Sequence, residues 1–337
     1  MISIEVEVFS DDIKKLGGGM KEFKNKQKEI LLEVENMTIS FGMYDSKRNR
    51  REFEMVHNLS LRVNSGEILV VAGSSGSGKS LLAHAVLGIL PGNAVQTGKI
   101  FFRGQELNHR AQERLRGREI GFIPQSVTYL DPLMRVEKQV IGVCKRKERK
   151  QQKKRLREIF ERYQLEESVA KLYPYQLSGG MARRVLIAGS VMNQASLIVA
   201  DEPTPGLNRK LEEEMLQDFR KLAEEGCGIL LITHEIDLAF EVADRIAVMY
   251  GGTVVETADV RAFKSGKGGL RHPFSQAFLQ ALPQNEFCPI KGLKPYEGKL
   301  PNDCVFAGCC PEKTMECEGE IPLKIFPDGE VRCIHAE

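Results

Sequence analysis

Short apolar runs of strand length recur along the chain from about residue 30 onward, separated by polar and glycine-rich turns. A segment with apolar residues at helical spacing, 80–90 (SLLAHAVLGIL), follows one such turn. The run before that turn, 67–73, is an expected strand, so the pattern predicts a strand–loop–helix unit. The other early strands are expected at 31–34, 37–41 and 59–63.

Strands and helices then alternate to about residue 256. A helix-rich stretch is expected from Asp131 to Gln176. Such alternation is typical of a largely parallel sheet covered by helices on both faces, so we expect an α/β fold. Further strands are expected at 99–102, 120–124, 197–200, 228–234 and 245–256, and further helices at 181–192 and 210–226.

Composition narrows the class of protein. No stretch approaches the roughly 20 apolar residues that cross a bilayer, and the first residues lack the pattern of an export signal. The formal net charge is +2 with 28% charged residues, so we expect no nucleic-acid partner. We therefore expect a protein that stays in the cytosol and reaches a membrane only through partners.

Composition also divides the chain. Residues 1–29 are polar and are expected to form a flexible extension, and residues 30–265 are expected to form one large α/β domain. Within that domain, about 131–185 is expected to be a helical subdomain. From residue 266 to 337 the chain is rich in Pro, Gly and Cys, which predicts a small C-terminal extension.

The turn after the strand at 67–73 matches the phosphate-binding P-loop pattern, with the strand and the helix that this motif requires. Glycines let the backbone approach a phosphate closely, and N–H groups at the helix start attract the anion. Lys79 is expected to reach the β- and γ-phosphates and the Ser80 hydroxyl to ligate Mg²⁺. The loop consists of Gly73, Ser74, Ser75, Gly76, Ser77, Gly78, Lys79 and Ser80.

An acidic pair follows the apolar strand at 197–200. Asp201 is expected at the sheet edge, beside the P-loop and its metal ion. Glu202 is the expected general base that polarises the attacking water.

The segment Leu177-Ser178-Gly179-Gly180-Met181, with the P-loop and the strand end VADEPT, resembles the signature of ABC-transporter ATP-binding subunits. The resemblance implies a P-loop NTPase of the ABC type that hydrolyses ATP. It also implies that two such domains pack head to tail around two ATP molecules. Ser178, Gly179 and Gly180 of one domain would then cap the γ-phosphate held by the other, so hydrolysis is coupled to closure.

The same resemblance assigns three further positions. Gln125, in GFIPQS, is similar to the glutamine that senses Mg²⁺ and contacts the transport partner. His234, in LLITHE, is similar to the histidine that holds the γ-phosphate and orients Glu202. Phe41 is the expected aromatic residue that stacks on adenine. The implied Mg²⁺ ligands are Ser80, Gln125 and Asp201.

Two positions depart from the family pattern. Asn208 stands where an aspartate is usual, and Arg183 stands where a glutamine commonly precedes Arg184. Both departures put equal activity of the two ATP sites in doubt. We therefore expect a heterodimer with a second, related ATPase.

The segment from Arg271 to Pro283 resembles the C-terminal extension of the oligopeptide/dipeptide and related nickel importer ATPases. This resemblance implies two membrane permease subunits as partners and a peripheral location on the cytoplasmic side of the membrane. It also implies that an extracellular solute-binding protein takes part in transport without contacting this chain directly. Peptide is the favoured cargo. Nickel or another small solute is the first alternative, and a soluble ABC ATPase outside transport is the second.

Cysteines are concentrated near the end of the chain, and in a reducing compartment such crowding favours a metal site over disulfides. The resemblance implies a four-cysteine iron–sulfur site at Cys304, Cys310, Cys317 and Cys333, and four thiolates suit a 4Fe-4S cluster. Zinc is the chemical rival. Reduced thiols that pack a small subdomain remain a third interpretation.

Overall fold

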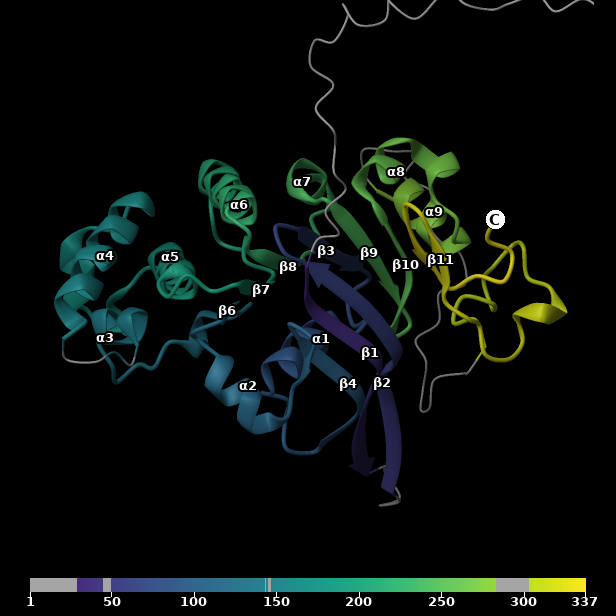
Figure 1. The fold of residues 1–337 in the computed structure, drawn as a ribbon, viewed down its shortest axis with the longest axis horizontal. Helices are drawn as coiled ribbons and strands as arrows, with labels where there is room; N and C mark the ends of the chain where they lie inside the picture. The colour runs from purple at the N-terminus through teal and green to yellow at the C-terminus, as the bar shows by residue number, and fades with distance from the viewer. Residues whose placement is uncertain (1–28, 45–49, 143, 145–146, 283–302) are drawn as a thin grey trace, which may run out of the picture.

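Two β-sheets form the framework of the protein (Figure 1). The computed structural model describes residues 29–44, 50–142, 144, 147–282 and 303–337. The expected N-terminal extension therefore lies outside the described residues, apart from Glu29.

The centre of the larger sheet is parallel. The carboxyl ends of β3 and of its parallel neighbours lie at one edge, and β3 pairs with β8 and β9 while β7 pairs with β8 and β6. The parallel strands read as continuous apolar runs because both faces of the sheet are covered. Its order is β11 (Lys324–Phe326), β12 (Gly329–Val331), β10 (Thr253–Asp259), β9 (Arg245–Tyr250), β3 (Ile68–Gly73), β8 (Gly228–Ile232), β7 (Leu197–Asp201) and β6 (Ile120–Ile123).

The strands at one edge of this sheet, opposite β6, are antiparallel. β10 pairs antiparallel with β9 and β12, and β12 pairs antiparallel with β11. The C-terminal residues thus extend the larger sheet through β12 and β11. The expected α/β fold is confirmed, with an antiparallel edge that the sequence pattern did not predict.

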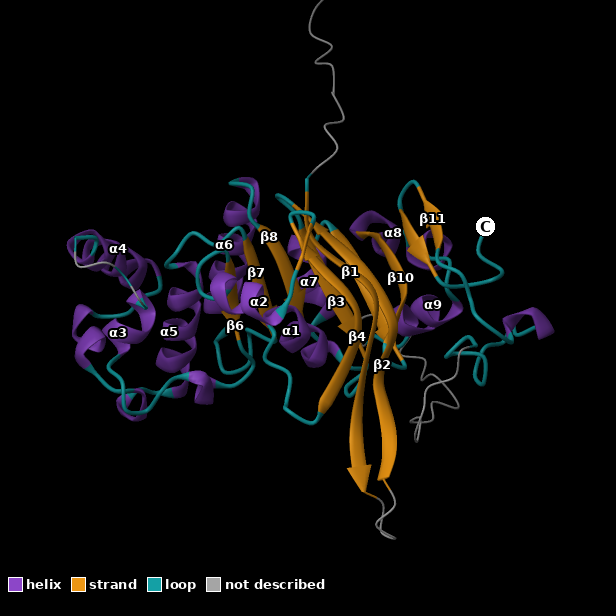
Figure 2. Ribbon diagram, turned by 60° about the horizontal axis from the view of Figure 1, so that its bottom comes forward, coloured by secondary structure: helices purple, strands orange, loops and turns teal. Residues whose placement is uncertain are grey.

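The smaller sheet is antiparallel and lies beside the larger one (Figure 2). One strand, β1, spans the two strands expected at 31–34 and 37–41. Asn36 has a φ of 46°, and the pairing register shifts between Val34 and Met37, so a bulge keeps the strand continuous. The strands in order are β2 (Arg50–Asn64), β1 (Ile30–Tyr44), β4 (Ala94–Phe102) and β5 (Gln105–Glu106).

Alternate residues of β3 point into two different cores. Val70 packs in one apolar cluster with Phe219 of α6, whereas Val71 packs in another with Leu82 of α1. Helices therefore cover both faces of the larger sheet, as the alternating pattern predicted. The helices of this part are α1 (Lys79–Leu87), α2 (His109–Leu115), α6 (Arg209–Glu224), α7 (Ile236–Val242), α8 (Val260–Lys264) and α9 (Pro273–Gln280).

A group of helices lies to one side of the larger sheet, beyond β6, and the C-terminal segment lies on the other side (Figure 1). The group contains α3 (Val136–Ile141), α4 (Arg149–Arg162) and α5 (Gly179–Val191). Short 3-10 turns complete the helical elements, at Val127–Tyr129, Glu167–Lys171, Pro174–Gln176, Gly266–Gly269 and Met315–Cys317. Over the described part of the chain, no helix has both the length and the apolar character to traverse a bilayer.

Candidate nucleotide-binding site

The glycine-rich loop joins β3 to α1 and places the start of that helix at the carboxyl end of the central strand. A Cβ at Gly73 would lie 2.1 Å from the carbonyl oxygen of Met249. Gly78 has a φ of 95°, and a Cβ there would lie 2.9 Å from the Cγ2 atom of Val56. Only glycine fits these two positions, so the sequence fixes a backbone cradle whose N–H groups can bind an anion.

Lys79, the first residue of α1, folds its side chain over the loop. Its Nζ atom donates to the carbonyl oxygens of Gly73 at 3.0 Å and Ser74 at 2.8 Å. Burial lowers the pKa of Lys79, while the carboxylates of Glu202 and Asp201 oppose that shift. The cation is therefore held at the cradle by carbonyl dipoles and can exchange them for phosphate oxygens.

Asp201 ends β7 with its side chain buried at 2% exposure. Burial raises its pKa, and a hydrogen bond from Ser80 acts in the opposite direction. Its Oδ1 atom has no hydrogen-bond partner among the described residues. A buried carboxylate with an unused oxygen beside a serine hydroxyl matches the oxygen ligands that Mg²⁺ prefers.

Glu202 is held from both sides. The amide Nε2 of Gln125 donates to one carboxylate oxygen at 2.7 Å, and Nδ1 of His234 lies 3.2 Å from the other. The residue has a φ of 44°, which is uncommon for glutamate, and its backbone N–H donates to Ile232 at 2.9 Å. Strained backbone of this kind is frequent at functional sites.

The structure therefore brings together the expected phosphate, metal and base residues. Lys79, Gln125, Glu202 and His234 follow four neighbouring strands, β3, β6, β7 and β8. The carboxyl ends of these parallel strands meet at one edge of the sheet, which is where open α/β sheets bind ligands. The arrangement can hold a phosphate chain beside a carboxylate that polarises water.

Two other expected contributors lie apart from this centre. Ser178 caps the start of α5, where its hydroxyl accepts from the N–H of Met181 at 3.3 Å. Among the described residues, no hydrogen bond joins Ser178–Gly180 to the phosphate loop, and α5 lies well away from α1 in Figures 1 and 2. Phe41 lies in β1, partly buried against the core that contains α1. The roles expected for these residues stay predictions.

Arg183 makes a contact to this site that the sequence did not predict. It is 5% exposed, and its guanidinium donates to the carbonyl oxygens of Pro124 at 2.6 Å and Gln125 at 2.5 Å. Burial lowers its pKa. The helix that follows the signature is thus bonded to the backbone of the residue that holds Glu202. Its place in the signature was the only signal in the sequence.

His84 and Tyr129 form a second unexpected contact. His84 Nε2, on α1, lies 3.1 Å from the hydroxyl of Tyr129, on the segment that follows Gln125. Burial lowers the pKa of His84. Burial, with Asp201 as a second cause, raises the pKa of Tyr129. This pair links the helix after the phosphate loop to the segment after Gln125.

The four cysteines of the predicted cluster are close enough to interact electrostatically. Burial raises the pKa of Cys304 to about 11, with further contributions from the thiols of Cys333, Cys310 and Cys317. Electrostatic interactions also link Cys310 with Cys317 and Cys333, and Cys333 with Cys317. Within the described ranges, however, no group of three or more His, Cys, Asp or Glu side chains could hold a metal ion. The structure therefore gives no support to the iron–sulfur cluster or to the zinc alternative, and these four cysteines are free thiols.

Comparisons with known proteins agree with this geometry. The family model described as ABC transporter matches residues 56–205. The chain is 32% identical over 323 residues to the dipeptide transport ATP-binding protein DppD of Escherichia coli, covering 90% of this chain and 96% of that protein. It is 32% identical over 295 residues to the oligopeptide transport ATP-binding protein OppD of Bacillus subtilis, covering 82% and 80%.

Solved structures give the same answer. The dimeric structure of a bacterial ABC transporter cassette matches with a TM-score of 0.60 and 29% identity, covering 68% of this chain and 99% of that chain. A post-hydrolysis state of such a cassette, bound to ADP and Pi, matches with a TM-score of 0.60 and 28% identity over the same shares. The chain is therefore an ATPase that belongs to the ABC transporter family, in the branch of the dipeptide and oligopeptide transport ATP-binding proteins.

Proposed function

We propose that this chain hydrolyses MgATP to drive the uptake of dipeptides or oligopeptides through membrane permease partners. The observation that carries the hydrolytic part is the convergence of Gln125, Glu202 and His234 beside Lys79. The peptide cargo rests on the relatives, which are named for dipeptide and oligopeptide transport. No observation favours nickel, another solute or a role outside transport.

The phosphate chain would bind in the loop from Gly73 to Ser80. Backbone N–H groups and the start of α1 attract its charge, and Lys79 exchanges its carbonyl partners for β- and γ-phosphate oxygens. Ser80, Gln125 and Asp201 would hold Mg²⁺, which neutralises negative charge on the phosphates. The unused Oδ1 of Asp201 supports this ligand set.

Glu202 would take a proton from the attacking water. Both of its carboxylate oxygens are already held, by Gln125 and His234, so its orientation depends on the segments that carry those two residues. His234 would also contact the γ-phosphate. A shift of the Gln125 segment, caused by a permease, would then move the base and change the hydrolysis rate.

The second half of each ATP site would come from a facing subunit. Ser178, Gly179 and Gly180 are exposed or half-buried at the start of α5, where a neighbouring γ-phosphate can reach them. Asn208 caps α6 by accepting from Leu211 at 3.0 Å, so it keeps the local shape without the charge of an aspartate. We therefore propose a heterodimer with a second ATPase of the same family.

The remaining assignments are also proposals. Phe41 would stack on adenine. Residues 30–265 would form the nucleotide-binding domain, with 131–185 as its helical subdomain and 266–337 as an extension. The complex would contain two permease subunits, act with an extracellular binding protein, and place this chain at the cytoplasmic face of the membrane.

The iron–sulfur site belongs to this proposal as its least supported part. The four interacting thiols, Cys304, Cys310, Cys317 and Cys333, equal in number and match in chemistry the ligands of a 4Fe-4S cluster. Anaerobic purification, an absorbance scan near about 400 nm and iron analysis test this. A colourless, iron-free protein would remove the cluster.

Reconstitution of the complete transporter in liposomes tests the proposed function. Uptake of a labelled dipeptide should require ATP on the side of this chain, and Lys79→Ala should abolish both uptake and its coupled hydrolysis. Labelled nickel serves as the comparison cargo. ATP-dependent accumulation of nickel without peptide would overturn the proposed cargo, and normal peptide uptake by Lys79→Ala would overturn the proposed mechanism.

A further inference from the structure

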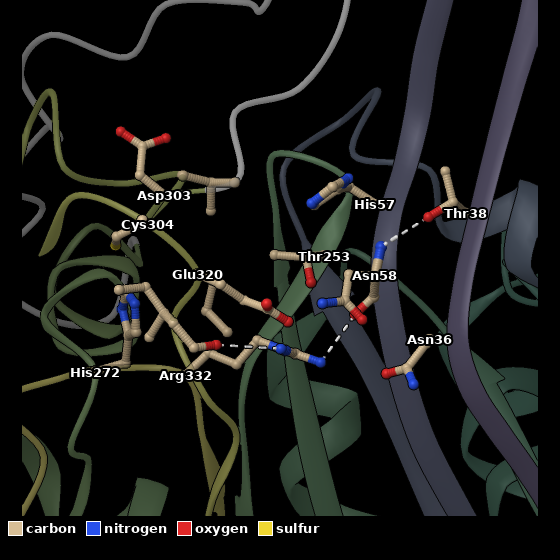
Figure 3. Close-up of a pocket in the computed structure, with 14 residues that line it drawn as sticks. Asn36, Thr38, His57, Asn58, Thr253, His272, Asp303, Cys304, Glu320 and Arg332 are labelled. Atoms are coloured by element: carbon tan, nitrogen blue, oxygen red, sulfur yellow. Dashed lines mark hydrogen bonds between the residues drawn. The ribbon is translucent and has the colours of Figure 1, made fainter. Parts of the chain in front are cut away.

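A cavity of about 490 Å³ lies between the smaller sheet, β10 and the C-terminal segment (Figure 3). Its walls come from β1, β2, β10, the start of α9 and the segments around Cys304, Glu320 and Arg332. None of the residues assigned to ATP lines it. Its volume lies within the range of about 300–1,000 Å³ that is usual for small-ligand sites.

Arg332 joins the walls of this cavity. Its guanidinium donates to the carbonyl oxygen of Asn58, on β2, at 2.9 Å and to that of Ile321 at 3.4 Å, and its backbone N–H donates to Val255 of β10 at 2.8 Å. Figure 3 shows the side chain between these walls. The cavity is thus enclosed by segments that hydrogen bonds hold together.

Several buried polar atoms of the cavity residues have no hydrogen-bond partner among the described residues. They are Asn58 Oδ1, Thr253 Oγ1, His272 Nε2 and Asp303 Oδ1. Thr253 and His272 are only 5% and 1% exposed. A folded protein rarely leaves such atoms unpaired, so their concentration at one cavity needs a cause.

The nucleotide-binding site provides a comparison within the same chain. There, Ser77 Oγ and Asp201 Oδ1 are likewise buried and unpaired, beside the loop that binds the phosphates of ATP. Such atoms also occur singly elsewhere in the described residues, but at the phosphate loop they stand beside an open site that a ligand can enter. The second cavity has the same feature.

The chemistry of the walls restricts the ligand. His272 Nδ1 accepts from the N–H of Phe274 at 3.0 Å. Because Nδ1 acts as the acceptor, the ring proton lies on Nε2, which is an unused donor. Asn58 Oδ1 is an unused acceptor, and the Thr253 hydroxyl can act in either way.

Both signs of charge also line the cavity. Glu320 makes no ion pair with another described residue, although it lies within electrostatic reach of Arg332. In Figure 3 the side chains of Glu320, Thr253, Asn58 and Arg332 converge, while His272 and Cys304 lie together at another part of the wall. A ligand that carries an ammonium and a carboxylate group would match these partners.

We propose that this cavity binds a small zwitterion, between an amino acid and a dipeptide in size. Glu320, Asn58 Oδ1 and Thr253 receive the ammonium group, and the remaining N–H donors of Arg332, which lie beside them, receive the carboxylate. The His272 donor, at the other part of the wall, is left for a peptide carbonyl oxygen. A short peptide is a ligand of this class, and that link to the cargo alone rests on the proposed function. The site would let the product of uptake contact the ATPase subunit directly.

Calorimetric titration of the full chain with L-alanyl-L-alanine, without nucleotide, tests the proposal. We expect saturable one-to-one binding. The N-acetylated dipeptide lacks the ammonium and the dipeptide amide lacks the carboxylate, so each should bind at least tenfold more weakly. Absence of saturable binding at about 10 mM would overturn the proposal, as would equal binding of either blocked compound.

Two variants locate the binding. Thr253→Val replaces the unpaired hydroxyl by a methyl group of similar size, and Glu320→Gln removes the carboxylate charge. Each should weaken binding at least tenfold, whereas Glu318→Gln, an exposed carboxylate of the same segment outside the cavity, should not. Unchanged binding in both test variants would contradict the site. ATP hydrolysis, measured in parallel, reports separately on the proposed function because the two sites share no residue.

Discussion

Replacement of Arg183 by methionine tests how the signature helix is coupled to the catalytic base. Arg183 donates two hydrogen bonds, to the backbone carbonyl oxygens of Pro124 and Gln125. The side chain of Gln125 in turn donates a hydrogen bond to Glu202. A hydrogen bond from a charged donor contributes about 1.5–3 kcal/mol, so the two bonds together are worth about 3–6 kcal/mol. Methionine keeps the apolar stem and removes both bonds.

Without these bonds the segment that carries Gln125 should shift, which recovers part of the lost free energy but weakens the hydrogen bond between Gln125 and Glu202. If the free energy of the transition state rises by about 1.4–2.8 kcal/mol as a result, kcat falls about tenfold to a hundredfold. The contacts of the phosphate loop do not involve Arg183, so the KM for ATP should change less than about threefold. Arg183→Lys, which can keep one bond, should retain intermediate activity.

The assay is steady-state ATP hydrolysis by the assembled transporter, with urea denaturation of each variant. Arg220→Met is the matched control, because Arg220 also donates to a carbonyl oxygen, that of Val242 at 3.4 Å, and pairs with Asp244 at 2.9 Å away from Gln125. It should lower stability without lowering kcat. A normal kcat in folded Arg183→Met, or an equal loss in Arg220→Met, would refute the coupling.

Three further predictions concern single side chains. Glu202→Gln should lower the kcat of ATP hydrolysis by about a hundredfold or more in steady-state assays. ATP should still bind to this variant, and filter binding of labelled ATP checks that. Asp201→Asn should raise the free energy of unfolding of the nucleotide-free protein by on the order of 1 kcal/mol, because burial raises the Asp201 pKa and disfavours its charge; calorimetric melting at pH 7 checks this. A lower melting temperature would contradict it. His272 stays neutral in the fold, with a pKa of about 3, whereas the unfolded chain takes up a proton below about pH 6.5. Stability should therefore fall with pH between those values by up to about 1.4 kcal/mol per pH unit, and His272→Asn should fall less steeply in urea titrations at pH 7 and pH 5.

Most of the proposed ATP site could be predicted because its residues follow neighbouring strands of one parallel sheet. Glu202 follows β7, His234 follows β8 and Gln125 follows β6, so the topology alone brings their side chains to a common edge. The P-loop is a contiguous motif, and its two constrained glycines explain why its spacing is fixed. The sequence motifs and the order of the strands therefore place the same residues at this edge of the sheet.

Contacts between distant segments could not be predicted in this way. Arg183 reaches backbone carbonyls 58 and 59 positions away, and any sequence near Gln125 presents the same carbonyls. Arg332 reaches Asn58 across 274 positions. The strands expected at 31–34 and 37–41 merge into β1 through a bulge against β2, where Asn36 has a positive φ. Local propensity does not predict such a bulge.

The most direct test of the central claim is ATP-dependent assembly of the two ATPase subunits, measured by light scattering after size-exclusion chromatography. With Glu202→Gln in this chain, hydrolysis at the site formed by its own phosphate loop is strongly slowed, and ATP bound there should hold the pair together. Adding Ser178→Arg should abolish the assembly, because the signature can no longer approach the partner's γ-phosphate, while each subunit still binds ATP. ATP-dependent assembly that persists with Ser178→Arg would contradict the account.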